Sequence, residues 1–333
     1  MTATTPPPDA LNAPEGITPL SELGLIRAEG PEAAAFIHRQ LTQDFSLLDA
    51  AHARLAALCN PQGRMLASFI GIRPEPETVL LVCSADALAA TLKRLSMAVL
   101  RAKLKITDAS AEFALYGIAG HALAGNGLDA AAAPWQVTQC NAAGAGTNTN
   151  AGWAVSLYPA DGVARALWIG AKTAAPQGPI LPPAYWPWSD VRSGVATLSA
   201  AAAGAFVPQM LNYESVGGVN FKKGCYPGQE VVARSQFRGA LKRRAAIVRA
   251  AGPVTAGQDV FAAGDPEQPA GKVVQAAPAP SSVVSAGSLS GAWAAIISAR
   301  IETLAAGSAL HAGAPGGVAL TVEPLPYALL DDV

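Results

Sequence analysis

The first third of the chain alternates hydrophobic and polar residues with the periods of strands and helices. An apolar run at residues 20–28 predicts a strand, and Phe36, Ile37 and Leu41 form one face of a helix predicted to start at residue 30. Further predicted elements are a hairpin with its turn at residues 60–63 and its second strand at 65–73, a strand at 78–83, a helix at 87–100 and a strand at 103–107. This β-β-α-β order is typical of a ferredoxin-like layer, a sheet with helices on one face.

The pattern then restarts, and later it changes to strands alone. Strands are predicted at residues 113–118, around 137 and at 153–157, with a short helix at 120–128 and a short helix and strand end at 163–174. After Glu230, five or six short apolar runs alternate with Gly, Pro and Asp turns at a spacing of about 8–12 residues. That spacing favours a small barrel or sandwich, which we expect from residue 238 onward.

Composition indicates a globular protein with more than one domain. The chain has 333 residues, of which 51% are hydrophobic and 14% are charged, which suits two or three cores. No apolar run reaches the ~18 residues that cross a bilayer, and the N-terminus lacks a cationic start and an apolar h-region, so we expect a cytoplasmic protein without membrane contact. The four cysteines and four histidines are scattered, which argues against a disulfide framework and a metal site.

Positive charge is concentrated in one stretch of a chain whose net charge is −1. Residues 221–249 hold eight basic residues and one acidic residue, a local charge of +7 that leaves −8 for the rest of the chain. A solvated strand pair with cationic faces would explain this charge, but the charge lies beside a motif rich in reactive groups. A site for an anionic ligand or a nucleic acid is therefore the favoured interpretation.

The motif itself is FKKGCYPGQE, residues 221–230. Gly224 and Gly228 indicate positions that need a positive φ or a close approach of another group. The two lysines before Cys225 favour its thiolate. A reactive thiol and a structural cysteine in a tight loop both stay open as interpretations of this residue.

Two further groups of residues are candidates for binding a flat ligand. Gln229 and Glu230, at the end of the motif, can form paired hydrogen bonds with a heterocycle that has donor and acceptor edges. The segment AYWPWSDVRSG, residues 184–194, holds three aromatic residues around Pro187 in a chain with only 6% aromatic residues. It favours equally the start of a packed helix and a stacking site for a flat ligand.

Residues 208–244, PQMLNYESVGGVNFKKGCYPGQEVVARSQFRGALKRR, resemble the signature of the folate-binding YgfZ family, relatives of the aminomethyltransferase (T-protein) of glycine cleavage. The lysine-glycine-cysteine-tyrosine pattern followed by GQE is highly specific, and LTQDF, NPQGRM and VEPLPY fall where the family has similar segments. The resemblance thus spans nearly the whole chain. It implies an α+β fold with two interleaved ferredoxin-like α/β units and a C-terminal antiparallel β-barrel around a central cavity that holds tetrahydrofolate or a derivative.

The resemblance also implies domain limits and residue roles. Residues 16–55 and 109–237 would form the first α/β unit and carry the motif, residues 56–108 the second unit, and residues 238–333 the barrel. The catalytic group would be Cys225 with Lys223 and Tyr226 beside it. The residues expected to contact folate are Trp186, Gln209, Asn212, Gln229, Glu230 and Arg234. A second tryptophan of the family falls near Leu23, where this chain has no aromatic residue.

The family supports iron–sulfur enzymes, including the radical enzyme that methylthiolates tRNA. We therefore expect a folate-binding accessory protein for iron–sulfur cluster assembly or repair, whose partners are tRNA-modifying enzymes, rather than a conventional enzyme. One alternative is a tetrahydrofolate-dependent one-carbon (aminomethyl) transferase, which the lack of an evident counterpart to the catalytic aspartate of T-protein before NPQGRM disfavours. The other is a direct tRNA-binding protein that uses the basic segment at residues 222–249.

Overall fold

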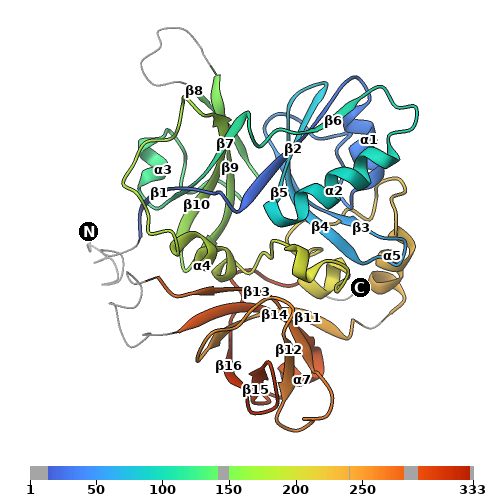
Figure 1. Cartoon of the computed structure of the whole chain (residues 1–333), viewed down its shortest axis with the longest axis vertical. Helices are drawn as coiled ribbons and strands as arrows, with labels where there is room; N and C mark the ends of the chain where they lie inside the picture. Colours follow the sequence, from blue (N-terminus) through green and yellow to red (C-terminus); the bar gives the residue numbers. More distant parts are fainter. Residues whose placement is uncertain (1–13, 142–149, 240, 281–291, 331–333) are drawn as a thin grey trace, which may run out of the picture.

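The computed structural model describes residues 14–141, 150–239, 241–280 and 292–330. Two open sheets lie side by side, and a closed barrel lies below them (Figure 1). Within the described ranges no helix is both long enough and apolar enough to span a membrane. The expected fold class, with two sheet units and a C-terminal antiparallel barrel, is confirmed.

The first sheet, called sheet A, has five antiparallel strands in the order β1-β7-β10-β9-β8. Their bounds are Gly16–Pro19 (β1), Phe113–Ala119 (β7), Val163–Ala171 (β10), Asn150–Ala160 (β9) and Val137–Asn141 (β8). The short helix α3 (Ala122–Gly125) covers one face of this sheet, where Leu123 packs in a cluster with Ile118 and Trp168. The second sheet packs against the other face.

The second sheet, called sheet B, has five antiparallel strands in the order β3-β4-β5-β2-β6. Their bounds are Ala53–Cys59 (β3), Met65–Glu75 (β4), Thr78–Ser84 (β5), Leu23–Glu29 (β2) and Lys105–Asp108 (β6). Two helices, α1 (Ala33–Gln40) and α2 (Ala85–Ala98), pack on one face of sheet B. Sheet B is therefore the ferredoxin-like layer that the sequence pattern predicts.

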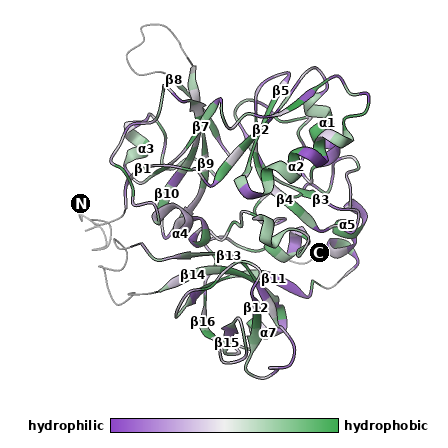
Figure 2. Cartoon of the chain, viewed as in Figure 1, coloured by the Kyte–Doolittle hydropathy of each residue, from purple (hydrophilic) through white to green (hydrophobic). Residues whose placement is uncertain are grey.

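The side chains of β2 alternate between the two faces of sheet B, which explains why sheet B lies between its helices and sheet A. Ile26 packs with Phe36 of α1 and Leu95 of α2, whereas its neighbour Leu25 packs with Ile169 of sheet A. Successive side chains of a strand point to opposite faces, so an apolar pair in β2 buries both faces of the sheet. The result is a four-layer α-β-β-α stack, and Figure 2 shows that the strands of both sheets are mostly hydrophobic.

The barrel closes in the strand order β11-β14-β13-β12-β15-β16. Its elements are β11 (Arg243–Ala250), β12 (Asp259–Ala262), β13 (Gly271–Pro278), β14 (Trp293–Arg300), α7 (Ile301–Ala305), β15 (Leu310–Ala312) and β16 (Val318–Glu323). Val248 and Ile297 fill the barrel, while Ile296 packs outward against Trp188 and Tyr213. The outward contacts join the barrel to the connecting elements α4 (Tyr185–Arg192), η2 (Ala200–Ala202), η3 (Pro208–Leu211) and α5 (Gln229–Phe237).

Strand pairing differs from the expected division of the two α/β units. Strand β2 falls in residues 16–55, which we expected to belong with residues 109–237, but β2 pairs with β5 and β6 of sheet B. The reason is that all seven residues of β2 find antiparallel partners on β5, which closes the hydrogen-bond ladder of sheet B. The other domain limits stay predictions.

Two local expectations are wrong. Residues 163–174, expected as a short helix and a strand end, begin with the strand β10, which lies between β7 and β9. Its run of buried side chains suits a central strand, and a short apolar run has no period that separates a strand from a helix. The chain also does not pass directly from GQE into strands, because helix α5 comes first.

Candidate functional site

A pocket lies between sheets A and B, beside α4 and the segment that follows it. Its space, counted out into the open solvent at its mouth, is about 490 Å³, and its lining is mainly apolar. Sheet B contributes Leu23, Leu55 and Ile70, and sheet A contributes Tyr158 and Arg165. Pockets of this kind, apolar with a few convergent polar groups, are the usual binding sites for small organic ligands.

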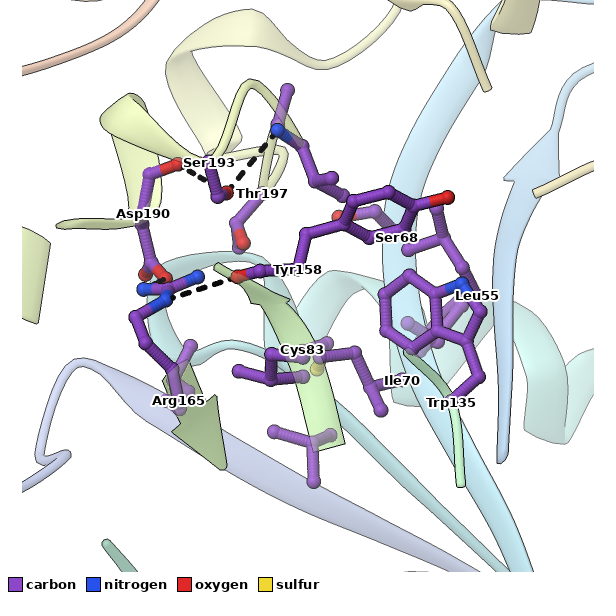
Figure 3. Close-up of a pocket in the computed structure, with 16 residues that line it drawn as sticks. Leu55, Ser68, Ile70, Cys83, Trp135, Tyr158, Arg165, Asp190, Ser193 and Thr197 are labelled. Atoms are coloured by element: carbon purple, nitrogen blue, oxygen red, sulfur yellow. Dashed lines mark hydrogen bonds and ion pairs between the residues drawn. The ribbon is translucent and has the colours of Figure 1, made fainter. Parts of the chain in front are cut away.

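The polar side of the pocket is a buried ion pair. Arg165, on β10, donates from Nη1 to Asp190 Oδ1 at 2.8 Å and to Ser189 Oγ at 2.6 Å. The Arg165 side chain is 2% exposed and the Asp190 side chain is 20% exposed. The pair holds a guanidinium and a carboxylate, one hydrogen-bond donor group and one acceptor group, at one end of an apolar pocket (Figure 3).

An aromatic wall faces this ion pair. Trp135 lines the pocket with Tyr158, and their ring centroids lie 5.8 Å apart in an edge-to-face arrangement. Tyr158 makes a similar contact with Tyr327, which follows the barrel. Trp135 has a positive φ of 73°, an uncommon and strained conformation for a residue with a side chain. Its indole Nε1 donates to Val216 O at 2.9 Å, so the ring is held in place.

None of the six residues predicted to contact folate lines this pocket. Trp186 is 2% exposed and packs on Gly117, where an added Cβ would lie 2.2 Å from the indole. It contacts the site through Arg165, whose guanidinium carbon lies 4.9 Å from the centroid of the Trp186 ring, and it shares an apolar cluster with Leu157 of the lining. For α4 the structure agrees with the packed-helix interpretation of AYWPWSDVRSG.

Gln209 and Asn212 hold elements together instead of facing a cavity. Gln209 Nε2 donates to Val232 O in α5 at 2.7 Å. Asn212 has a left-handed backbone, and its amide group bonds both the N–H and the carbonyl of Ala245 in β11. Through these bonds the η3 segment links α5 to the first strand of the barrel.

The predicted catalytic residues lie on a surface loop, residues 221–228, which we call the Cys225 loop. Cys225 is exposed, whereas Lys223 and Tyr226 are 8% and 6% exposed. The Lys223 ammonium lies 4.8 Å from the centroid of the Tyr226 ring and donates to the carbonyls of His38 and Leu41. Burial lowers the pKa of Lys223 to about 8, although Asp44 and Cys225 act in the opposite direction.

Two other segments of the resemblance, LTQDF and NPQGRM, contact the Cys225 loop. Gly228 has φ 80°, and a Cβ there would lie 2.4 Å from Asn60 O of the NPQG turn. Gly224 does not share this need, because its φ is not positive and an added Cβ would make only an ordinary contact, 3.5 Å from His38 Nε2. The LTQD segment contacts the loop as well, because Leu41 O accepts from Lys223 Nζ at 2.6 Å.

The last three predicted folate residues lie in α5. Gln229 Nε2 donates to Lys223 O of the Cys225 loop at 3.5 Å. Glu230 and Arg234 form an exposed i,i+4 ion pair at 2.5 Å. The structure places these three residues outside the pocket between the sheets.

Acidic residues from other parts of the chain pair with two of the eight basic residues of the basic segment. Arg244 pairs with Glu214 at 2.6 Å in the interior, and Arg249 pairs with Glu323. Lys222, Arg238 and Lys242 are exposed. The local charge of the sequence thus overstates the charge that the folded surface presents near the Cys225 loop.

Sequence reasoning missed the residues that make the pocket polar and aromatic. Arg165 and Asp190 are 25 positions apart and lie on a strand and a helix, so no local motif marks them. Trp135 carried a weak signal, a tryptophan directly after proline in an alanine-rich stretch. His38 and Asp44 carried another, since both flank LTQ, but only the fold brings them to the Cys225 loop.

Comparisons with known proteins agree with this architecture. Residues 9–126 match the family model described as the GCVT N-terminal domain. The tRNA-modifying protein YgfZ of Edwardsiella ictaluri is 30% identical over 242 residues, which cover 72% of this chain and 72% of that protein. The solved structure of glycine cleavage system aminomethyltransferase T from Bartonella henselae superposes with a TM-score of 0.67 at 16% identity, covering 96% of this chain and 88% of the other. The chain therefore belongs to the YgfZ family and has the fold of the glycine-cleavage aminomethyltransferase.

Proposed function

We propose that this protein binds a reduced folate in the pocket between its two sheets and supports iron–sulfur enzymes that modify tRNA. The observation that carries the folate part is the buried Arg165–Asp190 pair opposite the Trp135–Tyr158 wall. The iron–sulfur and tRNA part rests on family membership.

The pocket chemistry suits a pterin ring. A pterin is flat, and one edge presents an amino group and a ring N–H beside a carbonyl oxygen. The Asp190 carboxylate can accept from the two N–H groups, and the Arg165 guanidinium can donate to the carbonyl. Trp135 and Tyr158 offer aromatic surface to the faces of the ring. In this proposal these four residues contact the pterin, while the six residues that the resemblance implied lie outside the pocket.

The folate part is tested by calorimetric titration with 5-formyltetrahydrofolate, an air-stable reduced folate. We expect saturable binding to the wild-type protein and a loss of about 10- to 100-fold in affinity for Asp190→Asn, because a hydrogen bond to a charged group contributes about 1.5–3 kcal/mol. Asp161→Asn is the matched control, since Asp161 pairs with Arg192 outside the pocket. Absence of binding heat with the wild-type protein would refute the proposal.

The accessory part is tested in a bacterial strain that lacks its own YgfZ. Expression of the wild-type chain should restore methylthiolated tRNA, measured by mass spectrometry of tRNA nucleosides. Asp190→Asn should restore less, at equal protein level. Full restoration by Asp190→Asn would separate the tRNA role from the pocket.

Direct contact with tRNA is a second candidate, favoured by the exposed Lys222, Arg238 and Lys242. Contacts with phosphates release counterions, so affinity should fall steeply with salt. A gel-shift titration with tRNA at two salt concentrations tests this role. Binding that is absent, or that does not change with salt, rejects it.

A further inference from the structure

The end of α5 carries the one aromatic side chain that is exposed among the described residues. Phe237, the last residue of α5, is 55% exposed. The other phenylalanine, tyrosine and tryptophan residues are buried or partly buried. Helix α5 lies at the periphery of the molecule, between sheet B and the barrel (Figure 1). Single exposed apolar side chains are common on proteins, so the meaning of Phe237 depends on what surrounds it.

A second phenylalanine supports the ring of Phe237. Phe221, at the start of the Cys225 loop, packs against the apolar cluster that joins the barrel to α4, η3 and α5. The ring centroids of Phe221 and Phe237 lie 5.2 Å apart at an interplanar angle of 72°, which is an edge-to-face contact. Phe237 thus rests on a ring that is anchored in the core, while more than half of its own surface stays in solvent. A side chain held in this way offers a flat surface at a fixed place.

Positive charge adjoins both rings. Lys222 follows Phe221 in the chain and is exposed, and Arg238, which follows Phe237, is exposed as well. Within the described ranges neither cation forms an ion pair with an acidic residue, and the acidic residue of α5 is already paired inside its own helix. We call these four residues, Phe221, Lys222, Phe237 and Arg238, the Phe237 surface. It combines an exposed aromatic ring with two cations that can contact an anion.

Unpaired nucleotides have the chemistry that fits such a surface. Their bases are flat with open faces, and each lies between negatively charged phosphates, whereas neighbouring base pairs cover these faces in a duplex. Proteins that bind single strands combine aromatic side chains, on which bases stack, with cations that contact the backbone. An acidic protein would suit the cations as well, but protein interfaces bury a wider apolar centre. Phe237 is the only large apolar residue that the structure describes as exposed in α5 or the Cys225 loop.

We propose that the Phe237 surface binds an unpaired nucleotide of an RNA. The base stacks on the Phe237 ring, and Lys222 and Arg238 contact the phosphates on either side of it. Transfer RNA presents such nucleotides in its loops and at its 3′ end. The inference deepens the direct contact with tRNA proposed above and rests on it. It does not depend on folate, because the four residues of the Phe237 surface lie outside the pocket between the sheets.

The test is the fluorescence anisotropy of a labelled oligoribonucleotide of about 12 nucleotides, titrated with the whole protein alone or after pairing with its complement. Phe237→Ala should bind the single strand about 10-fold more weakly than the wild type, a typical loss for one stacked base, and should bind the duplex as the wild type does. Phe237→Tyr, which keeps a ring, should retain wild-type affinity. Met97→Ala is the matched control at another exposed apolar residue and should change neither affinity. No binding of the single strand, equal affinity of wild type and Phe237→Ala for it, or the same loss for the duplex would overturn the proposal.

Salt dependence separates the ring from its cations. The slope of log affinity against log salt concentration should become shallower by about 0.7 in Lys222→Met and in Arg238→Met, the change expected for one lost phosphate contact on a single strand. Phe237→Ala should keep the wild-type slope, because a stacked base releases no counterions. Lys93→Met, which removes an exposed lysine of α2, is the control and should keep it too. Unchanged slopes in both Lys222→Met and Arg238→Met would overturn the assigned phosphate contacts.

Titration with whole tRNA distinguishes this inference from the contact on which it rests. Salt-dependent binding of tRNA that is equal for the wild type and Phe237→Ala would keep the direct contact and overturn the stacked base. Absence of tRNA binding would overturn both. A labelled glutamate-rich peptide that binds where RNA does not, and that loses affinity in Phe237→Ala, would assign the surface to a protein partner and overturn the proposal.

Discussion

The pocket between the sheets and the Cys225 loop differ in how their parts are distributed along the chain. The pocket takes residues from Leu23 to Thr197, contributed by both sheets and α4. The Cys225 loop is one continuous motif, held from outside by the α1 end and the NPQG turn. A site built from distant elements depends on the packing of those elements, whereas a site on one loop depends on a few hydrogen bonds and close backbone contacts. Mutations in the two regions should therefore change stability by different mechanisms.

The largest effect is expected in the pocket, for Arg165→Met. The substitution leaves the Asp190 carboxylate without its cation in a buried setting, so the free energy of unfolding should fall by about 3–5 kcal/mol. Urea denaturation followed by circular dichroism measures this change. Arg27→Met is the control, because Arg27 pairs with Glu112 at the surface and should cost about 1 kcal/mol or less. Equal losses of free energy of unfolding in the two variants would show that burial makes the Arg165–Asp190 pair no more important for stability than the surface pair.

The difference between the two regions also explains what could be predicted from sequence. The β-β-α-β order and the barrel strands were predictable because each element has its own period or turn signals. The pairing of β2 with β5 was not, since residues as far apart as Gly24 and Cys83 meet only in the fold. Cys225, Lys223 and Tyr226 could be predicted as a group because they lie within four successive positions, and their catalytic role stays a prediction. Arg165 and Asp190 were not, because the closeness of β10 and α4 is a property of tertiary packing.

A second prediction compares two glycines of the Cys225 loop. Gly228→Ala should lower the free energy of unfolding by about 2–3 kcal/mol, because φ is 80° and the new Cβ would lie 2.4 Å from Asn60 O. Gly224→Ala should change it by less than about 1 kcal/mol, since neither constraint applies there. Urea denaturation of the two variants side by side gives both values. A loss at Gly224 as large as that at Gly228 would mean that the loop is constrained along its whole length.

The smallest effect is a pH dependence that belongs to the Cys225 loop alone. Lys223 has a pKa of about 8 in the folded protein and an ordinary value of 10.5, so between these values the unfolded chain binds more protons. The free energy of unfolding then rises with pH in this window, while below about pH 8 the cost of the buried ammonium is fully present. A neutral amine still has two N–H groups for the carbonyls of His38 and Leu41, so the hydrogen bonds survive deprotonation.

This dependence is measured by urea denaturation at pH 7.5 to 10, in a Cys225→Ala background so that the thiol does not titrate. The difference in free energy of unfolding between the parent and its Lys223→Met variant should increase by about 1 kcal/mol from the low to the high end of this pH window. The increase is this small because solvent near the loop screens part of the effect. Lys222→Met removes the neighbouring, exposed lysine, and its difference in free energy of unfolding from the parent should not change with pH. A pH-independent difference in free energy of unfolding between the parent and Lys223→Met would mean that Lys223 titrates as it does in water. The loop would then be held by hydrogen bonds, without a buried ammonium that lowers stability.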